Sequence, residues 1–368
     1  MYYGFIALIA MLLTFPVQAK TLYQDKTLNA ELVSQFKGVI WGLSLINDAE
    51  AILTLRKGQA FHLNLTTGKQ TLLTGLPKIA TPGQGGLLDV AASPDFNATN
   101  WLYFTYSKPT TQGVETTFAR AKLNGASLTN WQDLFVSQSA SSSGQHFGSR
   151  IAFDDQGYVY FGIGDRGNRP NGQNLTNHAG AILRLHLDGR IPSDNPFVGQ
   201  AEAQAAIWSY GHRNPQGLFF DNTTKTLWSN EHGPRGGDEI NQIKRGANYG
   251  WPIISHGKEY WGPISVGDGT EKAGIEAPLK VFIPSIAPSA LHIYQGALFK
   301  DWQGSFLSTA LAKRHLNLVS FDNQSKATES RFLEDLDERF RAITEDSKGY
   351  IYLGTDSGKL IKLSPFKP

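Results

Sequence analysis

The chain has 368 residues with a formal net charge of +2, and only 18% of its residues are charged. Lysine and arginine are scattered rather than grouped in basic blocks, so nothing indicates a nucleic-acid-binding protein. Because cysteine is absent, disulfides and thiolate metal sites are excluded, and any metal must bind oxygen or imidazole ligands.

Residues 1–19 have the pattern of a secretory signal peptide. An apolar run is followed by Pro16 and by the small-residue pattern that ends at Ala19. The run is shorter than the roughly 20 apolar residues that span a bilayer, although an uncleaved anchor helix is the alternative. We therefore predict cleavage before Lys20, a mature chain of residues 20–368, no membrane insertion, and a periplasmic or secreted location.

One pattern recurs along the rest of the chain: an apolar stretch, a polar turn and a second stretch of alternating apolar residues. Repetition about every 45 to 80 residues is typical of a propeller or solenoid, and short strands between Gly and Asp turns favour four-stranded blades. The fold prediction is a single-domain, all-β, six-bladed β-propeller, closed by pairing of strand 359–363 with the early strands. The six copies span residues 42–55, 87–106, 150–165, 216–230, 295–309 and 341–356. The polar runs 137–144 and 257–272 are interpreted as loops between blades.

A histidine next to a glycine-rich turn is the first candidate catalytic residue. His146 lies in the run 144–150, just before a predicted strand, and a neutral imidazole can act as a general base. Asp165 ends the next strand of the same copy, where a carboxylate can orient that imidazole. Both residues have structural alternatives, a turn histidine and a common Gly-Asp turn. Further histidines compete for the role: His178, His212, His232, His256, His292 and His315.

Three further polar clusters follow in the chain. Arg213 and Asn214 can bind an anionic or carbonyl-rich ligand, or Arg213 can stabilise a loop. The run 230–241 combines carboxylates with carbonyls beside Gly and Pro, which suits calcium although the spacing is not that of an EF-hand. Arg339 and Arg341 alternate on one face of a strand, which suits an anion with several carboxylates unless this face is a solvated edge.

Taken together, these segments resemble the soluble quinoprotein aldose sugar dehydrogenases, the glucose/sorbosone dehydrogenase family. Each stretch is short, but their order along the chain is highly specific, and the resemblance extends from about Gln35 to the C-terminus. The stretches that carry it are residues 83–90, 144–150, 211–217, 231–241, 248–252 and 339–341.

The resemblance implies an enzyme that oxidises the C1 hydroxyl of aldose sugars to lactones, with pyrroloquinoline quinone (PQQ) above the channel mouth as hydride acceptor. It implies that His146 is the general base, that Asp165 holds its imidazole, and that Arg213 stabilises the developing oxyanion. One calcium, bound by the carbonyls of Gly233 and Pro234, would polarise the quinone. The implied cofactor-binding residues are Gln84, His146, Arg213, Asn214, Tyr260, Lys313, Arg339 and Arg341.

The resemblance also implies a second calcium and a cofactor-binding lysine. Glu239 and Tyr249 would bind a second, structural calcium. The family places its cofactor-binding lysine directly after an Ala-Leu pair, whereas here Ala312 follows that pair and Lys313 comes one residue later. On a strand, a shift by one residue turns the side chain to the opposite face unless a bulge intervenes.

Two other functions fit a propeller, since a fold does not determine a function. One is a non-enzymatic module that binds a partner or carbohydrate, and the other is a calcium-dependent lactonase-type hydrolase. The paired Arg339 and Arg341 suit a tricarboxylate cofactor better than a neutral lactone. The dehydrogenase interpretation also requires an electron acceptor, which the sequence does not identify, and it is compatible with a monomer or a homodimer.

Overall fold

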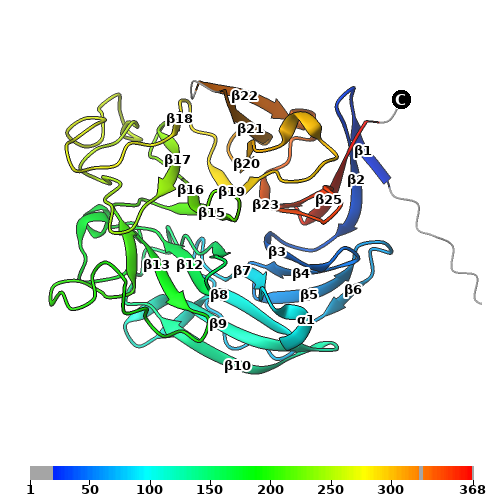
Figure 1. Ribbon diagram of the computed structural model, residues 1–368, viewed down its shortest axis with the longest axis horizontal. Coiled ribbons are helices and arrows are strands. Elements are labelled where there is room, and N and C mark those ends of the chain that lie inside the picture. The colour runs from blue at the N-terminus through cyan, green and yellow to red at the C-terminus, as the bar shows by residue number, and fades with distance from the viewer. Residues whose placement is uncertain (1–19, 323–325, 367–368) are drawn as a thin grey trace, which may run out of the picture.

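The computed structural model describes residues 20–322 and 326–366, and the predicted signal peptide lies outside this range. In the described residues the strands form six antiparallel sheets that surround a common axis, which confirms the six-bladed β-propeller (Figure 1). The only α-helix among them is a single turn, α1 (Phe96–Thr99), with short 3-10 segments at Arg169–Gln173, Lys300–Trp302 and Glu334–Leu336. None of these helices has the length or apolar character that crossing a membrane requires.

The first three blades follow one another along the chain, each starting at the channel and ending at the outer edge. Blade 1 contains β3 (Ile40–Asn47), β4 (Glu50–Leu55), β5 (Gln59–Asn64) and β6 (Gln70–Leu72). Blade 2 contains β7 (Leu87–Ala92), β8 (Trp101–Thr110), β9 (Gly113–Asn124) and β10 (Ser127–Val136). Blade 3 contains β11 (Ile151–Phe153), β12 (Tyr158–Ile163), β13 (Ala181–His186) and β14 (Ile207–Tyr210).

The other three blades complete the ring. Blade 4 contains β15 (Pro215–Asp221), β16 (Thr226–Glu231), β17 (Asp238–Ile243) and β18 (Lys280–Phe282). Blade 5 contains β19 (Pro288–Ile293), β20 (Phe306–Ala310), β21 (Leu316–Phe321) and β22 (Ala327–Phe332). Blade 6 contains β23 (Phe340–Glu345), β24 (Ile351–Thr355), β25 (Lys359–Pro365), β2 (Leu28–Gln35) and β1 (Lys20–Gln24).

The ring closes where the two ends of the described chain meet in blade 6. The C-terminal strand β25 pairs antiparallel with β2, and Leu32 lies opposite Ile361 in that register. The predicted closure by strand 359–363 is therefore confirmed. Closing the ring in this way pairs strand edges that would otherwise invite aggregation.

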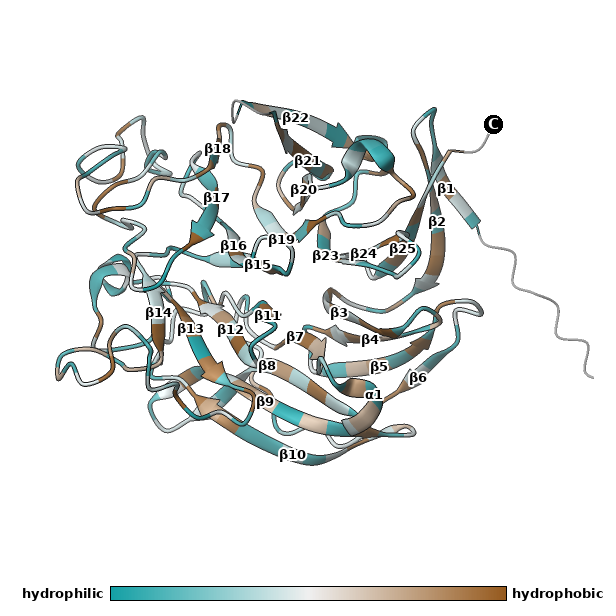
Figure 2. Ribbon diagram, viewed as in Figure 1, coloured by the Kyte–Doolittle hydropathy of each residue, from teal (hydrophilic) through white to brown (hydrophobic). Residues whose placement is uncertain are grey.

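The hydrophobic core lies between neighbouring blades. Hydrophobic and hydrophilic residues alternate along strands such as β8 and β9, so each sheet presents apolar faces to its neighbours (Figure 2). Between blades 2 and 3, Phe118 stacks on Tyr103 with ring centroids 5.4 Å apart and on Phe161 at 5.2 Å. Aromatic residues fill such wide gaps efficiently, which accounts for their high frequency in this sequence.

Two sequence-based assignments were wrong in detail. The fifth repeat was placed at 295–309, but the inner strand β19 ends at Ile293, and residues 294–305 form a loop with a 3-10 turn. The run 257–272 connects β17 to β18 inside blade 4, not two blades. The first error assigned an apolar run to a strand, although it lies in a loop. The second assigned a polar run to a boundary between blades, although a blade can carry a long loop between its own strands. The run 137–144 does connect blades 2 and 3, as predicted.

Candidate functional site

His146 and Asp165 form a hydrogen-bonded pair at the mouth of the channel. Their side chains come from the connection between blades 2 and 3 and from the end of β12, and His146 Nδ1 lies 2.6 Å from Asp165 Oδ1. The backbone N–H of His146 donates to Gln84 Oε1 at 2.9 Å, which holds the loop in place. The predicted partners are therefore brought together.

The carboxylate of Asp165 is fixed by two further donors. It is 1% exposed, and it accepts hydrogen bonds from Trp251 Nε1 at 2.8 Å and from the backbone N–H of Gly167 at 2.7 Å. Burial raises the pKa of Asp165, but the hydrogen bond and charge of His146 outweigh it, so the net pKa is lowered. An ionised carboxylate only accepts hydrogen bonds, so Nδ1 of His146 is the donor, and in the neutral form of the imidazole Nε2 is the nitrogen that can accept a proton.

Arg213 lies next to this pair. Its carbonyl oxygen accepts the backbone N–H of Asp165 at 2.8 Å, and its backbone N–H donates to Glu231 Oε2 at 2.8 Å. The guanidinium contacts the carbonyl oxygen of His232 at 3.2 Å and the Tyr260 hydroxyl at 3.5 Å. Its Nε is buried without a hydrogen-bond partner among the described residues. A buried donor without a partner is uncommon and is suited to an oxygen of a ligand.

Gly164 allows these elements to approach so closely. A Cβ atom at this position would lie 2.6 Å from the carbonyl oxygen of His146 and 2.8 Å from that of Arg213. Real Cβ atoms do not come so near to backbone oxygens, so any side chain here must push the two loops apart.

We expect Gly164→Ala to lower kcat by about tenfold or more, because misplacing a catalytic group by about 1 Å has effects of this size or larger. The measurement is the steady-state rate of the sugar oxidation that the family resemblance implies, with thermal unfolding to check the fold. Gly269→Ala is the matched control, since a Cβ there meets nothing nearer than 4.0 Å. Equal activities of the two variants would contradict this explanation.

A cavity of about 230 Å³ opens at the same end of the channel, where inner strands begin. Arg341 donates to Asp356 Oδ1 at 2.5 Å and Oδ2 at 3.0 Å, and Arg339 donates to Oδ2 at 2.8 Å. With Arg56, three guanidinium groups and one carboxylate line the cavity, a combined charge of +2 that suits a polyanion. Predicted residues that line it are Gln84, Asn214, Arg339 and Arg341.

The remaining predicted cofactor residues do not line this cavity. His146 adjoins it through its hydrogen bond to Gln84, and Arg213 lines a smaller cavity instead. Tyr260 is 65% exposed and reaches only the Arg213 guanidinium. Lys313 is exposed in the turn after β20 and does not line the cavity, whereas Leu311 does. Burial lowers the pKa of Arg56, and the charge of Arg341 lowers it further, so Arg56 belongs to the same electrostatic cluster. Sequence reasoning missed Arg56 and Asp356, and their only signal is that each directly follows the second strand of a blade.

The predicted metal residues surround a second, much smaller cavity of about 20 Å³. Gly233, Glu239 and Tyr249 line it, while Pro234 is adjacent in the chain. Glu231, which sequence reasoning missed, lies opposite Glu239 in the β16–β17 register and also lines the cavity. The side-chain amide of Asn241 donates to both carboxylates at 3.1 Å.

These residues fit a cation. Burial and then the charge of Glu231 raise the pKa of Glu239, which shows that two carboxylates here repel each other. A cation between them relieves that repulsion, and oxygen ligands from carboxylates and carbonyls are those that calcium prefers. No group of three or more His, Cys, Asp or Glu side chains forms a metal site within residues 20–322 and 326–366, so backbone carbonyls would have to complete the coordination.

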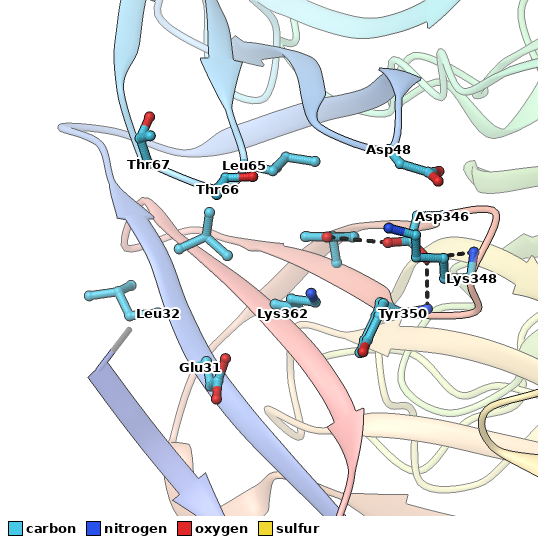
Figure 3. A pocket seen from close by; sticks show the side chains of 13 residues that line it. Glu31, Leu32, Asp48, Leu65, Thr66, Thr67, Asp346, Lys348, Tyr350 and Lys362 are labelled. Carbon is cyan, nitrogen blue, oxygen red and sulfur yellow. Dashed lines mark hydrogen bonds between the residues drawn. The ribbon is translucent and has the colours of Figure 1, made fainter. Parts of the chain in front are cut away.

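A larger cavity, of about 310 Å³, lies at the opposite end of the blades, where blade 6 meets blade 1 (Figure 3). Two of its carboxylates already accept hydrogen bonds. Asp346 accepts the backbone N–H groups of Lys348 at 3.0 Å and Tyr350 at 2.9 Å in a turn, and Asp48 accepts the hydroxyl of Ser347 from another blade. None of the predicted site residues lines it. Size alone therefore does not identify the site, and the channel mouth is the better candidate because the acid–base pair and the arginine cluster meet there.

The chain is similar to known proteins over most of its length. The family model described as Glucose / Sorbosone dehydrogenase matches residues 38–362. An aldose sugar dehydrogenase of Escherichia coli is 36% identical over 346 residues, which cover 92% of this chain and 93% of that protein. The crystal structure of the soluble aldose sugar dehydrogenase from the same organism, in the apo-form, matches 92% of this chain and all of that one (100%), with a TM-score of 0.88. The PQQ-bound aldose sugar dehydrogenase from Streptomyces coelicolor is 25% identical, covers 95% of this chain and 98% of its own, and has a TM-score of 0.76.

Proposed function

The chain belongs to the glucose/sorbosone dehydrogenase family, and from this premise we propose that it oxidises the C1 hydroxyl of aldose sugars to lactones, with PQQ as hydride acceptor and calcium as Lewis acid. The observation that carries the proposal is that the His146–Asp165 pair lies beside the arginine-lined cavity, to which the hydrogen bond between His146 and Gln84 connects it. An acid–base pair beside a polyanion site is what a quinone-dependent alcohol oxidation needs.

PQQ, when bound, supplies an electrophilic carbonyl carbon that takes up hydride, and calcium increases that electrophilicity. The protein's own residues handle the proton. Nε2 of His146 accepts it from the anomeric hydroxyl, and Asp165 stabilises the resulting imidazolium through Nδ1. Arg213, which lines the smaller cavity, would offer its unpaired Nε–H to an oxygen that becomes negatively charged.

The other site residues hold the two groups. Gln84, Asn214, Arg339 and Arg341 line the cavity and would bind PQQ, while Tyr260 would contribute through its contact with Arg213. The carbonyls of Gly233 and Pro234 would bind the catalytic calcium, and Glu239 and Tyr249 the structural one, with Glu231 an additional candidate ligand. We also propose that residues 1–19 direct export to the periplasm or beyond the cell. Aldose sugars are then the small-molecule partners, and an electron acceptor is needed to reoxidise the cofactor.

The decisive test is dye-linked oxidation of glucose by the purified apoprotein, with and without PQQ and calcium. We expect activity only when both are added, and loss of that activity in His146→Ala while PQQ binding persists. Failure of the wild-type protein to bind PQQ at micromolar concentration in the presence of calcium would contradict the proposal and favour the hydrolase or binding-module alternative.

Lys313 provides a narrower prediction. Since its side chain is exposed and away from the cavity lining, we expect Lys313→Ala to change the PQQ dissociation constant by less than about threefold, as for surface substitutions of about 0.5 kcal/mol or less. Titration of the apoprotein with PQQ, followed by tryptophan fluorescence, measures this constant. A loss of tenfold or more would mean that the turn rearranges to bring Lys313 to the cofactor.

A further inference from the structure

One buried guanidinium connects all six blades at the centre of the propeller. Arg150 directly precedes β11 in blade 3, is 8% exposed, and points across the channel. Each of its hydrogen bonds reaches the inner strand of a different blade. Its partners are the carbonyl oxygens of Trp41 at 3.2 Å, Gln216 at 3.4 Å, Ser289 at 3.1 Å and Arg341 at 3.2 Å, and Asp89 Oδ1 at 2.7 Å.

The number of donors matches the number of blades to be connected. A guanidinium carries five N–H groups, one on Nε and two on each Nη, and here every one has its own acceptor. Asp89 in blade 2 supplies the counter-charge, and its Oδ2 also accepts the backbone N–H of Ile151 at 2.8 Å. Arg150 also stacks on the Trp41 ring, 4.4 Å from its centroid. A lysine has only three donors, so it cannot make the same set of bonds.

Three of these partners, Trp41, Gln216 and Arg341, also line the arginine-rich cavity. Their backbone positions set the distance between the blade 6 and blade 4 sides of that cavity. Arg150 donates hydrogen bonds to the carbonyls of these residues but does not itself line the cavity. It can therefore fix this distance without touching a ligand.

We propose that Arg150 is a positioning residue of the cofactor site: its five hydrogen bonds hold the inner strands of the other blades at the spacing that the polyanion requires. The inference rests on the proposed function because it takes PQQ as the ligand of this site. The spacing of the inner strands, however, is a property of the protein alone. A purely structural buried arginine would affect stability and leave cofactor affinity unchanged.

The variants are Arg150→Lys, which keeps the charge near Asp89, and Arg150→Gln, which keeps two donors without charge. Arg184→Lys is the matched control, because Arg184 is another buried arginine of blade 3, bonded to Asp194 at 3.0 Å and stacked over Tyr158 at 3.8 Å, outside the cavity. The readouts are circular dichroism, the PQQ dissociation constant of the apoprotein, and hydrogen exchange of backbone amides at the starts of β3, β15, β19 and β23.

We expect Arg150→Lys to fold, to raise the PQQ dissociation constant about tenfold or more, and to accelerate exchange at those strand starts, because at least two of the five buried acceptors lose their donor. Arg184→Lys should lower the melting temperature without either effect. Unchanged exchange and affinity in a folded Arg150 variant overturn the proposal, as does failure of both variants to fold. If wild-type protein does not bind PQQ, the proposed function fails, while the exchange experiment still decides whether Arg150 sets the strand spacing.

Discussion

Replacing Asp165 by asparagine is expected to lower kcat by about 10³- to 10⁴-fold, the size of effect seen when the carboxylate of a catalytic triad is replaced in the same way. The carboxylate receives three donors: His146 Nδ1, Trp251 Nε1 and the backbone N–H of Gly167. An amide has one acceptor oxygen and must turn its NH₂ group toward at least one of them. If it faces His146, Nδ1 loses its proton to Nε2, and the imidazole can no longer accept the substrate proton.

Measuring kcat and PQQ affinity separately distinguishes this catalytic role from a structural one. Asp165→Asn should retain its PQQ dissociation constant, because the residue does not line the arginine-rich cavity. Asp154→Asn is the matched control: it removes a similarly buried carboxylate from blade 3 that accepts Gln156 and Tyr158 in a turn. It should lower the melting temperature and leave kcat nearly unchanged. Equal losses of kcat in both variants would indicate that Asp165 acts only through stability.

Replacing Arg341 by alanine is expected to weaken PQQ binding by about 100-fold, or roughly 3 kcal/mol, the range measured when one partner of a buried charge pair is truncated. Two effects contribute to the loss. The ligand loses one of three cavity guanidinium groups, and Asp356 loses two of its three hydrogen bonds. Burial raises the pKa of Asp356, and Arg341 followed by Arg339 outweighs it to give a lowered value, so the carboxylate depends on these arginines.

Arg314→Ala is the control for Arg341→Ala. Its side chain is 46% exposed and pairs with Asp337 at 2.6 Å on the surface, where an ion pair contributes little. Titration of both apoproteins with PQQ, at equal calcium, gives the comparison. A loss of affinity below threefold in Arg341→Ala would mean that the arginine cluster serves blade packing and not ligand binding.

Much of the site was predictable because it follows local rules. Strand alternation placed Arg339 and Arg341 on one face, and both line the cavity. The position of Asp165 at the end of the strand after His146 suggested their pairing, which the 2.6 Å contact confirms. Local rules were not sufficient for Arg56, Asp356 and Glu231, because each matters through a contact outside its own strand. Arg56 interacts with Arg341, Asp356 pairs with Arg339 and Arg341, and Glu231 lies opposite Glu239 on the next strand. A strand-end arginine or aspartate has the same sequence signal whether it faces a cavity or water.

The sequence by itself predicted the number of blades, closure by strand 359–363 beside the early strands, and the pairing of His146 with Asp165, since these depend on repetition, on alternation and on short motifs. Only the tertiary structure decided what meets at the channel axis. Arg150 has no unusual sequence context, yet it receives its five acceptors from five other blades. The physical reason is that a propeller brings the beginnings of its inner strands to one point, so contacts there join residues separated by most of the chain, and no local pattern records them.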